Sequence, residues 1–314
     1  MQNYQIKQIN YPSINGIDTI VATIYVPNDM PKGIIQISHG MCEYIGRYAK
    51  FMEYMANNGY IIAGNDHLGH GLSSKREDYG FFGSNNGYLN FIEDLHSLTK
   101  ILKAEYGNEL NYYLFGHSMG SFIARLYLSK YQAELSGAII CGTGGPNPMA
   151  YLGIIASMLS KQFKGERYRS QLLDKMAFGS LNKNIQDLRT DKDWLTRDEA
   201  IVDKYLQDPK CMFTFTAAGF KDLMRLSTKA NNRHWFKSID KQLPIYLIAG
   251  DDDPVGNYGK GVTKVYNQLL KNKVSDVELK LYPKARHEIL NEINNSEVFQ
   301  DILKWLNDKN KKTI

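Results

Sequence analysis

Apolar residues along the chain follow two patterns, short continuous runs and longer stretches with helical spacing. The runs occupy residues 33–38, 60–64, 112–115, 135–141, 243–250 and 277–282. Between runs, at 47–58, 88–106 and 260–270, apolar residues recur every three or four positions. A short apolar run is typical of a buried strand, and the longer spacing is typical of an amphipathic helix. We therefore expect an α/β protein with a mostly parallel, doubly wound sheet.

The two ends of the chain add further elements to this sheet. Residues 4–7 and 17–26 alternate or are β-branched, and Asn15-Gly16 between them is a turn signal, so two antiparallel strands are predicted. Near the other end, Val298, Phe299, Ile302 and Leu306 have the spacing of a closing amphipathic helix.

The alternation of strands and helices breaks between residues 144 and 232, where we expect helices but no strand. One apolar face there is formed by Tyr151, Ile154, Ile155, Met158 and Leu159, and a second cluster by Phe213, Phe215, Phe220 and Met224. The predicted division is a core in two parts, 1–143 and 233–314, with a helical cap insertion at 144–232. Most of these apolar side chains are expected to pack the insertion onto the core; the alternative is that some line an acyl tunnel.

Composition and charge narrow the class of protein. The chain has 314 residues, 43% hydrophobic and 23% charged, which is ordinary for a globular protein with one large core. The net charge of +5 is spread along the chain. This argues against a nucleic-acid partner, and it is compatible with transient contact with an anionic lipid surface.

Targeting and redox signals point to the cytoplasm. The first residues form no apolar signal segment, and no apolar stretch is long enough to span a membrane. Cys42, Cys141 and Cys211 lack metal or redox spacing. We expect them to be reduced thiols in a cytoplasmic protein.

The strongest chemical signal is Gly116-His117-Ser118-Met119-Gly120, which fits the pattern G-x-S-x-G. An apolar run precedes it and a helix-like stretch follows, which is the context of a nucleophile elbow. Such a turn holds the serine in a strained backbone conformation, and the glycines leave room for the neighbouring strand and helix. Ser118 is therefore the predicted nucleophile.

A serine hydroxyl needs a base, and the base needs an orienting acid. Only His234 and His287 follow Ser118, and His287 lies just beyond the last predicted strand, so we expect it to be the base and His234 to lie at a boundary or on the surface. The acid is expected after the strand at 243–250. Asp251, Asp252 and Asp253 are all candidates there.

We favour Asp253 as the acid because Pro254 follows it. A residue before proline is biased towards an extended backbone, which could aim the carboxylate inward. The other two aspartates would then be solvated turn residues or caps.

The oxyanion hole is expected to use two backbone N–H groups. One belongs to Met119, directly after the nucleophile, and the other to Met41, in the loop after the strand at 33–38. We interpret Cys42 as a buried inert thiol, and Glu43 and Arg47 as a structural ion pair.

Asp66, His67 and His70 could be considered as metal ligands, but we do not favour a metal site there. Asp66 and His67 are adjacent, Gly69 stands before His70, and no further ligands lie nearby in the sequence. A tight loop is the better interpretation.

Taken together, five stretches resemble the monoacylglycerol lipase and lysophospholipase branch of the α/β-hydrolase superfamily, of serine aminopeptidase S33 type. They are residues 39–48, 66–73, 116–120, 250–256 and 286–288, in the family's order. The resemblance implies an α/β-hydrolase fold, Ser118, Asp253 and His287 as a catalytic triad, and Met41 and Met119 as oxyanion donors. It also implies a helical cap at about 144–232 that shapes an acyl pocket.

The resulting hypothesis is a serine hydrolase that cleaves esters of monoacyl lipids, monoacylglycerol or lysophospholipid, through an acyl-enzyme on Ser118. It requires no metal or organic cofactor, and the expected partner is a small lipid ester. The alternatives are a general carboxylesterase, an S33-type aminopeptidase, and a catalytically silent binding protein on the same fold. The sequence leaves the substrate-binding residues and the oligomeric state open.

Overall fold

A computed structural model of the chain describes residues 3–311. Within them, eight strands form one sheet in the order β1-β2-β4-β3-β5-β6-β7-β8. The strands are β1 Tyr4–Pro12, β2 Thr19–Pro27, β3 Ile34–Ser38, β4 Ile61–Asn65, β5 Tyr112–His117, β6 Gly137–Cys141, β7 Ile245–Gly250 and β8 Val277–Tyr282. Pairing is antiparallel for β1–β2 and β2–β4 and parallel from β4 to β8. The predicted sheet, including the antiparallel pair at its edge, is confirmed.

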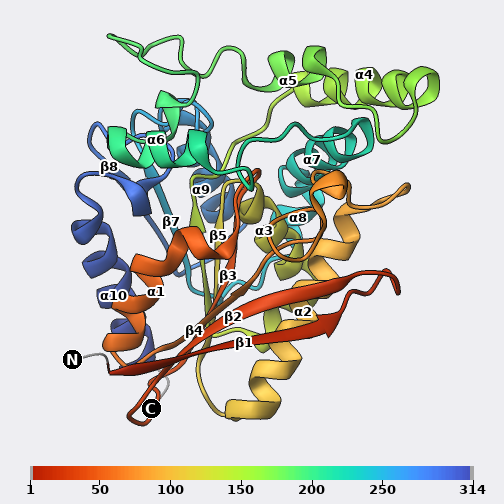
Figure 1. The fold of residues 1–314 in the computed structure, drawn as a ribbon. Coiled ribbons are helices and arrows are strands. Elements are labelled where there is room, and N and C mark those ends of the chain that lie inside the picture. Colours follow the sequence, from red (N-terminus) through yellow and green to blue (C-terminus); the bar gives the residue numbers. More distant parts are fainter. Residues whose placement is uncertain (1–2, 312–314) are drawn as a thin grey trace.

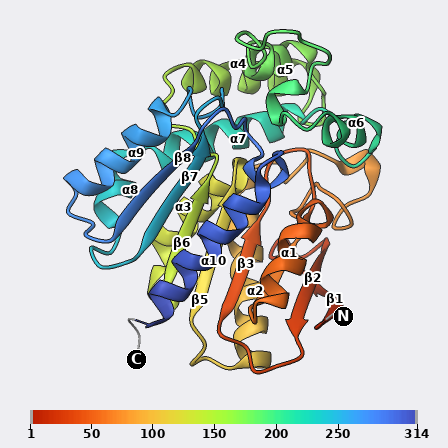
Figure 2. The same ribbon diagram turned by 90° about the vertical axis from the view of Figure 1, so that its left-hand side faces the viewer.

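The helices cover both faces of this sheet and its upper edge (Figures 1 and 2). They are α1 Ala49–Asn57, α2 Tyr88–Tyr106, α3 Met119–Tyr131, α4 Met149–Lys164, α5 Gln171–Phe178, α6 Glu199–Gln207, α7 Ala217–Ala230, α8 Arg233–Ser238, α9 Lys260–Lys271 and α10 Asn295–Lys311. The periodicity had not predicted α8, which is short. None of the helices in residues 3–311 is long and apolar enough to cross a lipid bilayer.

Alternation of side chains along the central strands builds two separate hydrophobic layers. In β5, Tyr112 and Leu114 join the layer under α2, α3, α8 and α9, whereas Tyr113 and Phe115 join the layer under α1 and α10. Every residue of β5 is buried. Burial on both faces explains why the central strands are continuous apolar runs rather than alternating ones.

Helices α4 to α7 lie across the upper edge of the sheet, between β6 and β7 in the sequence (Figure 1). An isolated bridge pairs Arg169 with Thr216, and no β-strand occurs within residues 144–232. Of the second apolar cluster, Phe215 and Phe220 are buried as expected.

The expectation that the apolar face of α4 packs onto the core is wrong for most of that face. Tyr151, Ile155, Met158 and Leu159 are each more than half exposed. Instead, α4 packs on α7 through small residues: Ala150 and Ser157 are buried, and Gly153 lies against the Met224 side chain. Small side chains let two helices approach closely, so the large apolar side chains of α4 are left on its outer side.

Candidate active site

Ser118 lies in a sharp turn between β5 and α3. Its backbone has φ 54° and ψ −119°, a conformation that non-glycine residues rarely adopt. A Cβ atom on Gly120 would collide with the carbonyl oxygens of Ser38 and His39, so only glycine lets α3 approach the end of β3. The backbone conformation predicted for the elbow is confirmed. The strained turn raises the Ser118 hydroxyl above the edge of the sheet.

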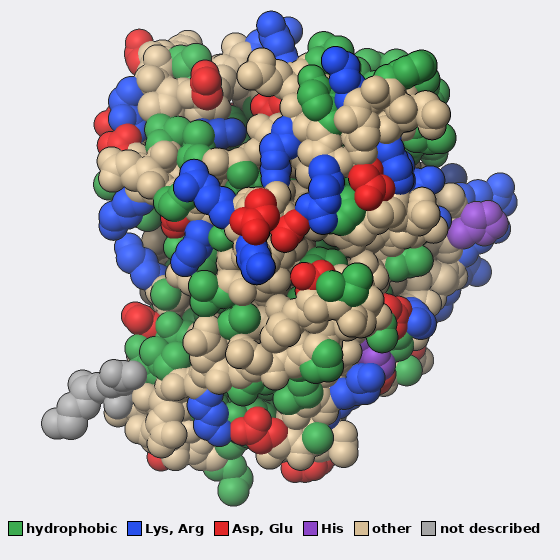
Figure 3. Space-filling model, turned by 45° about the vertical axis from the view of Figure 1, so that its right-hand side comes forward, with side chains coloured by type: hydrophobic (Ala, Val, Ile, Leu, Met, Phe, Trp, Pro, Cys, Tyr) green, Lys and Arg blue, Asp and Glu red, His purple; other side chains and the backbone are tan. Residues whose placement is uncertain are grey.

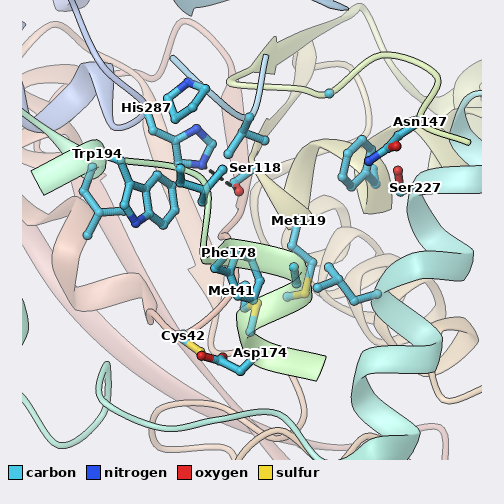
Figure 4. Close-up of a pocket in the computed structure, with 18 of the residues that line it drawn as sticks. Met41, Cys42, Ser118, Met119, Asn147, Asp174, Phe178, Trp194, Ser227 and His287 are labelled. Atoms are coloured by element: carbon cyan, nitrogen blue, oxygen red, sulfur yellow. Dashed lines mark hydrogen bonds between the residues drawn. The ribbon is translucent and has the colours of Figure 1, made fainter. Parts of the chain in front are cut away.

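The structure brings Ser118, His287 and Asp253 into one hydrogen-bonded line. His287 Nε2 lies 2.8 Å from Ser118 Oγ, and His287 Nδ1 lies 3.0 Å from Asp253 Oδ1. Asp253 and His287 are buried, at 0% and 2% exposure. Figure 4 shows the His287 ring directed at the Ser118 hydroxyl. This is the geometry in which an imidazole can take a proton from a serine.

The alternatives left open by the sequence lie elsewhere. Asp252 is exposed, and Asp251 Oδ1 accepts from the Lys284 amide at 2.6 Å. Asp253 Oδ1 also accepts from the Val255 amide at 2.8 Å, which fixes the carboxylate towards His287. His234 is exposed on α8, as expected.

Met41 and Met119 line the space in front of Ser118. A Cβ atom on Gly40 would lie 3.1 Å from Ser118 Cβ, so the loop that carries Met41 directly adjoins the nucleophile. Met119 is the first residue of α3. Among the described residues no acceptor takes the backbone N–H of either methionine. Two free amides beside the serine are what an oxyanion hole requires.

A buried charge network supports the Gly40–Met41 loop from behind. Glu43 Oε1 accepts from the Gly40 amide and from Tyr48 Oη, the latter at 2.8 Å. Arg47 Nη1 donates to Glu43 Oε2 at 3.1 Å. The expected ion pair is confirmed, but Glu43 also holds the backbone beside the predicted oxyanion donor.

The same network reaches the histidine loop. The Arg47 guanidinium binds both carboxylate oxygens of Glu288, at 2.6 and 2.7 Å, directly after His287 in the sequence. His117 lies between the two loops, 3.1 Å from Glu43 Oε1 and 3.3 Å from the His287 carbonyl oxygen. The sequence reasoning missed Glu288 and His117 as parts of the site, although both adjoin its predicted members.

Burial and charge shift the pKa values of this network in opposite directions. Burial alone would lower the pKa of His117, but the Glu43 carboxylate outweighs burial and raises it. For Glu43, burial opposes ionisation, yet His117 and Arg47 hold the pKa of the carboxyl well below its usual range. His117 and Arg47 therefore favour the ionised form of Glu43.

A cavity of about 500 Å³ opens beside Ser118. Core residues and residues of the helical segment line it together, and the segment contributes Asn147, Asp174, Phe178, Trp194 and Ser227 among others (Figure 4). The Trp194 ring lies at a tilt beside the His287 ring, with centroids 5.1 Å apart, and the Trp194 carbonyl oxygen accepts from the His287 amide at 3.4 Å. Trp194 lies in the single 3-10 turn Asp193–Leu195, which is too short for a periodic pattern to mark it.

His67 and His70, which we considered as possible metal ligands, are buried with His39 in the protein interior. The centroids of the His67 and His70 rings lie 4.3 and 5.2 Å from the centroid of the His39 ring. Asp66 accepts from the Ile45 and Leu72 amides, which closes the tight loop expected there. Burial lowers the pKa of His70 to about 3, so its ring is neutral.

Cys42 is buried, as expected, and burial raises the pKa of its thiol. A thiol whose pKa is raised has little thiolate and is a poor nucleophile. The interpretation of Cys42 as inert is therefore supported.

Comparisons of the sequence and of the structure with known proteins agree on one family. The sequence profile described as serine aminopeptidase, S33, matches residues 29–294. A monoacylglycerol lipase of Mycolicibacterium smegmatis is 26% identical over 95% of both chains, and a monoglyceride lipase of Saccharomyces cerevisiae is 28% identical over 88% of this chain and 84% of its own. The crystal structure of a thermostable carboxyl esterase from Bacillus coagulans, in complex with glycerol, superposes with a TM-score of 0.91 at 33% identity, covering 97% of this chain and 99% of the esterase.

Proposed function

The chain belongs to the serine aminopeptidase S33 family of α/β-hydrolases, and from this premise we propose that it hydrolyses carboxylic esters of monoacyl lipids. The observation that carries the proposal is the hydrogen-bonded line Ser118–His287–Asp253 at the mouth of a largely apolar cavity. Relatives named monoacylglycerol lipase and monoglyceride lipase support the same substrate class, and a similar structure of a carboxyl esterase supports ester hydrolysis.

In the proposed reaction, Ser118 Oγ attacks the ester carbonyl carbon while His287 Nε2 takes the hydroxyl proton. Asp253 holds the other ring nitrogen and stabilises the imidazolium. The backbone N–H groups of Met41 and Met119 bind the negative carbonyl oxygen. His287 then returns the proton to the departing alcohol, leaving an acyl group on Ser118. A water molecule, deprotonated by His287, attacks this acyl-enzyme and releases the fatty acid.

We assign the acyl chain to the apolar part of the cavity. Its walls include Phe122, Phe178, Leu223 and Met224, and its volume falls within the range of about 300–1,000 Å³ that is usual for small-molecule sites. We propose that residues 144–232 act as a cap, since their side chains close the cavity on the side away from the sheet. The experiment that follows distinguishes a glycerol head group from a lysophospholipid phosphodiester.

The first test measures fatty-acid release from a monoacylglycerol and from a lysophosphatidylcholine of the same chain length. We expect wild-type protein to release fatty acid from the monoacylglycerol, and Ser118→Ala and His287→Ala to lower kcat by at least about 10³-fold. His234→Ala is the matched control, because His234 is an exposed histidine on α8 and its loss leaves kcat unchanged.

Other outcomes redirect or reject the proposal. Release mainly from the lysophospholipid identifies a lysophospholipase. Hydrolysis of short esters alone identifies a general carboxylesterase. Full turnover by Ser118→Ala rejects the mechanism, and failure of wild type to react with a fluorophosphonate would favour a silent binding protein.

A peptidase has less support from the cavity. Of its acidic lining residues, Glu43 and Glu288 are bound to Arg47, which leaves Asp174, and Lys192 also lines the cavity. A peptide amino terminus would need an uncompensated negative charge. Cleavage of an aminoacyl p-nitroanilide faster than any ester would overturn this preference.

We further propose transient contact with an anionic lipid surface through α4. Its outer face carries several exposed apolar side chains, with Lys161 and Lys164 in the last turn. Figure 3 shows hydrophobic side chains gathered at the upper right, with lysines and arginines beside them. This combination is typical of helices that lie on a membrane surface.

A cytoplasmic location is also part of the proposal, and buried free thiols at Cys42, Cys141 and Cys211 support it.

A further inference from the structure

Arg125 is a fully buried cation at the place where the helical segment leaves and rejoins the core. It lies on α3, the helix that begins beside Ser118, and its exposure is 0%. Among the described residues no carboxylate forms an ion pair with it. Burial lowers the pKa of Arg125 to about 9, so it remains protonated at neutral pH. An unpaired buried charge is unfavourable unless its hydrogen bonds compensate it.

The hydrogen bonds of Arg125 go to both ends of the helical segment. Nη1 donates to Thr143 Oγ1 and to the Gly144 carbonyl oxygen, each at 3.3 Å, where the segment begins. Nη2 donates to the Ala230 carbonyl oxygen and, at 3.1 Å, to Asn231 Oδ1, where the segment ends. One side chain thus joins two points of the chain that are almost ninety residues apart.

Neighbouring groups complete this junction. Asn231 Nδ2 donates to the Gly144 carbonyl oxygen at 3.2 Å, so the two ends also bind each other directly. The guanidinium carbon of Arg125 lies over the Trp235 ring, 4.3 Å from its centroid, and the indole N–H donates to the Arg125 carbonyl oxygen. Four carbonyl or side-chain oxygens accept from the two Nη groups and an aromatic face covers the cation, whereas Nε has no acceptor among the described residues.

Both ends continue directly into walls of the cavity. Gly144, Gly145 and Asn147 line it on the leaving side, and Leu223, Met224 and Ser227 on the returning side. Figure 4 shows Asn147 and Ser227 among the residues that line the cavity beside Ser118. Phe122, one turn before Arg125 on α3, also lines the cavity, and a Cβ on Gly144 would lie 3.3 Å from its ring. Arg125 therefore lies directly behind this wall.

We propose that Arg125 is a positioning residue that joins the two ends of segment 144–232 and thereby sets the width of the cavity wall that receives the acyl chain. It does not contact substrate, and it acts through Gly144–Asn147 and Met224–Ser227. An apolar side chain would fill the same space without a buried charge, but it could not bind four oxygens from two chain ends. The inference rests on the proposed ester hydrolysis, because its clearest readout is selectivity among esters.

The test compares kcat and KM for p-nitrophenyl laurate and p-nitrophenyl acetate in Arg125→Met and Asn231→Ala. In Arg125→Met, we expect KM for laurate to rise about tenfold and kcat to stay within about twofold of wild type. The variant disorders the wall that binds the acyl chain and leaves the groups that carry out the reaction in place. The acetate, which is too short to use the wall, keeps its constants. Asn231→Ala, which leaves the arginine in place, is expected to raise KM for laurate by about two- to threefold.

Tyr60→Phe is the matched control for a general loss of stability. Tyr60 Oη donates to Asn307 at 3.0 Å, and this tyrosine is not among the residues that line the cavity. Tyr60→Phe is expected to lower the melting temperature without changing the ratio of KM for laurate to KM for acetate.

Hydrogen exchange gives a readout that is independent of activity. In both junction variants we expect faster exchange confined to residues 144–150 and 224–231. Equal changes for laurate and acetate, or unchanged KM and exchange in a folded Asn231→Ala, would overturn the inference. If wild type hydrolyses neither ester, the proposed function fails, whereas local exchange still decides whether Arg125 joins the two ends.

Discussion

Single side chains determine how the backbone near Ser118 is held. The Glu43 carboxylate accepts from the Gly40 amide, one residue before the predicted donor Met41, and also contacts His117 and Arg47. Buried charged groups are stable only when several partners bind them, so this network allows little freedom to the loop. Glu43 is thus a positioning residue in the proposed mechanism.

We expect Glu43→Gln to lower kcat for ester hydrolysis by about 10- to 100-fold with little change in KM. The amide keeps the size of the side chain but loses the charge that orders the Met41 loop, and removing an oxyanion donor outright costs about 10²–10³-fold. Steady-state kinetics on a short and a long ester measure this effect.

The control for this variant is Glu53→Gln, an exposed glutamate on α1. It is expected to match wild type. A rise in KM with unchanged kcat in Glu43→Gln would show that Glu43 supports substrate binding instead of the oxyanion site.

At the scale of elements, helix α4 has its large apolar side chains on the outside. Leu152 and Ile155 are 51% and 55% exposed, and Phe163 is 79% exposed. Contiguous exposed apolar side chains on one helix are unusual unless a surface covers them. Helix α4 is therefore the element on which a lipid-surface contact depends.

We expect the double substitution Leu152→Ser and Ile155→Ser to lower binding to vesicles of anionic phospholipid about tenfold or more, because two large apolar side chains no longer enter the interface. Vesicle co-sedimentation measures binding, and hydrolysis of a dissolved short ester should stay at the wild-type rate. Ile17→Ser, an exposed residue between β1 and β2, is the control away from α4. Equal binding by the α4 variant and wild type would reject the contact.

At the scale of the whole molecule, Asp222 connects the helical segment to the core. This buried residue of α7 faces the backbone at the beginning of α2, and a Cβ on Gly87 would lie 2.8 Å from its Oδ2. Burial raises the pKa of its carboxyl to about 6, although Lys221 and Arg225 oppose the rise. The folded protein therefore binds this proton more tightly than the unfolded chain does.

The sign of the pH effect follows from that raised pKa. The folded state is stabilised as pH falls from about 6 to about 4, and this stabilisation is lost as pH rises through 6. We expect Asp222→Asn, which resembles the neutral carboxyl, to raise the melting temperature by about 2–5 °C at pH 7.5. The difference from wild type shrinks towards pH 5.

Thermal unfolding at both pH values checks this prediction. Asp252→Asn is the control, because Asp252 is exposed and its neutralisation is expected to leave the melting temperature unchanged. A lower melting temperature for Asp222→Asn at pH 7.5 would show that the charged carboxylate stabilises the start of α2.

The sequence by itself determined the order of strands and helices, the elbow at Ser118 and the place of His287. These features depend on local patterns and on chain order: the bounds of α2 and β8 agree with the expected ranges, and a Cβ atom on Gly116 would collide with the helix that directly follows the elbow. Side-chain periodicity reports burial on both faces of a central strand without knowledge of its neighbours.

The sequence favoured Asp253 among three adjacent aspartates, but only the tertiary structure placed its carboxylate against His287, and it alone decided which side of α4 is buried and what surrounds Arg125. Each depends on contacts between residues far apart in the chain: Asp253 with His287, Gly153 with Met224, and Arg125 with Ala230. Periodicity identifies an apolar face but not the partner that covers it. Helix α7 packs against the small side chains of α4, so the large apolar side chains of α4 remain exposed.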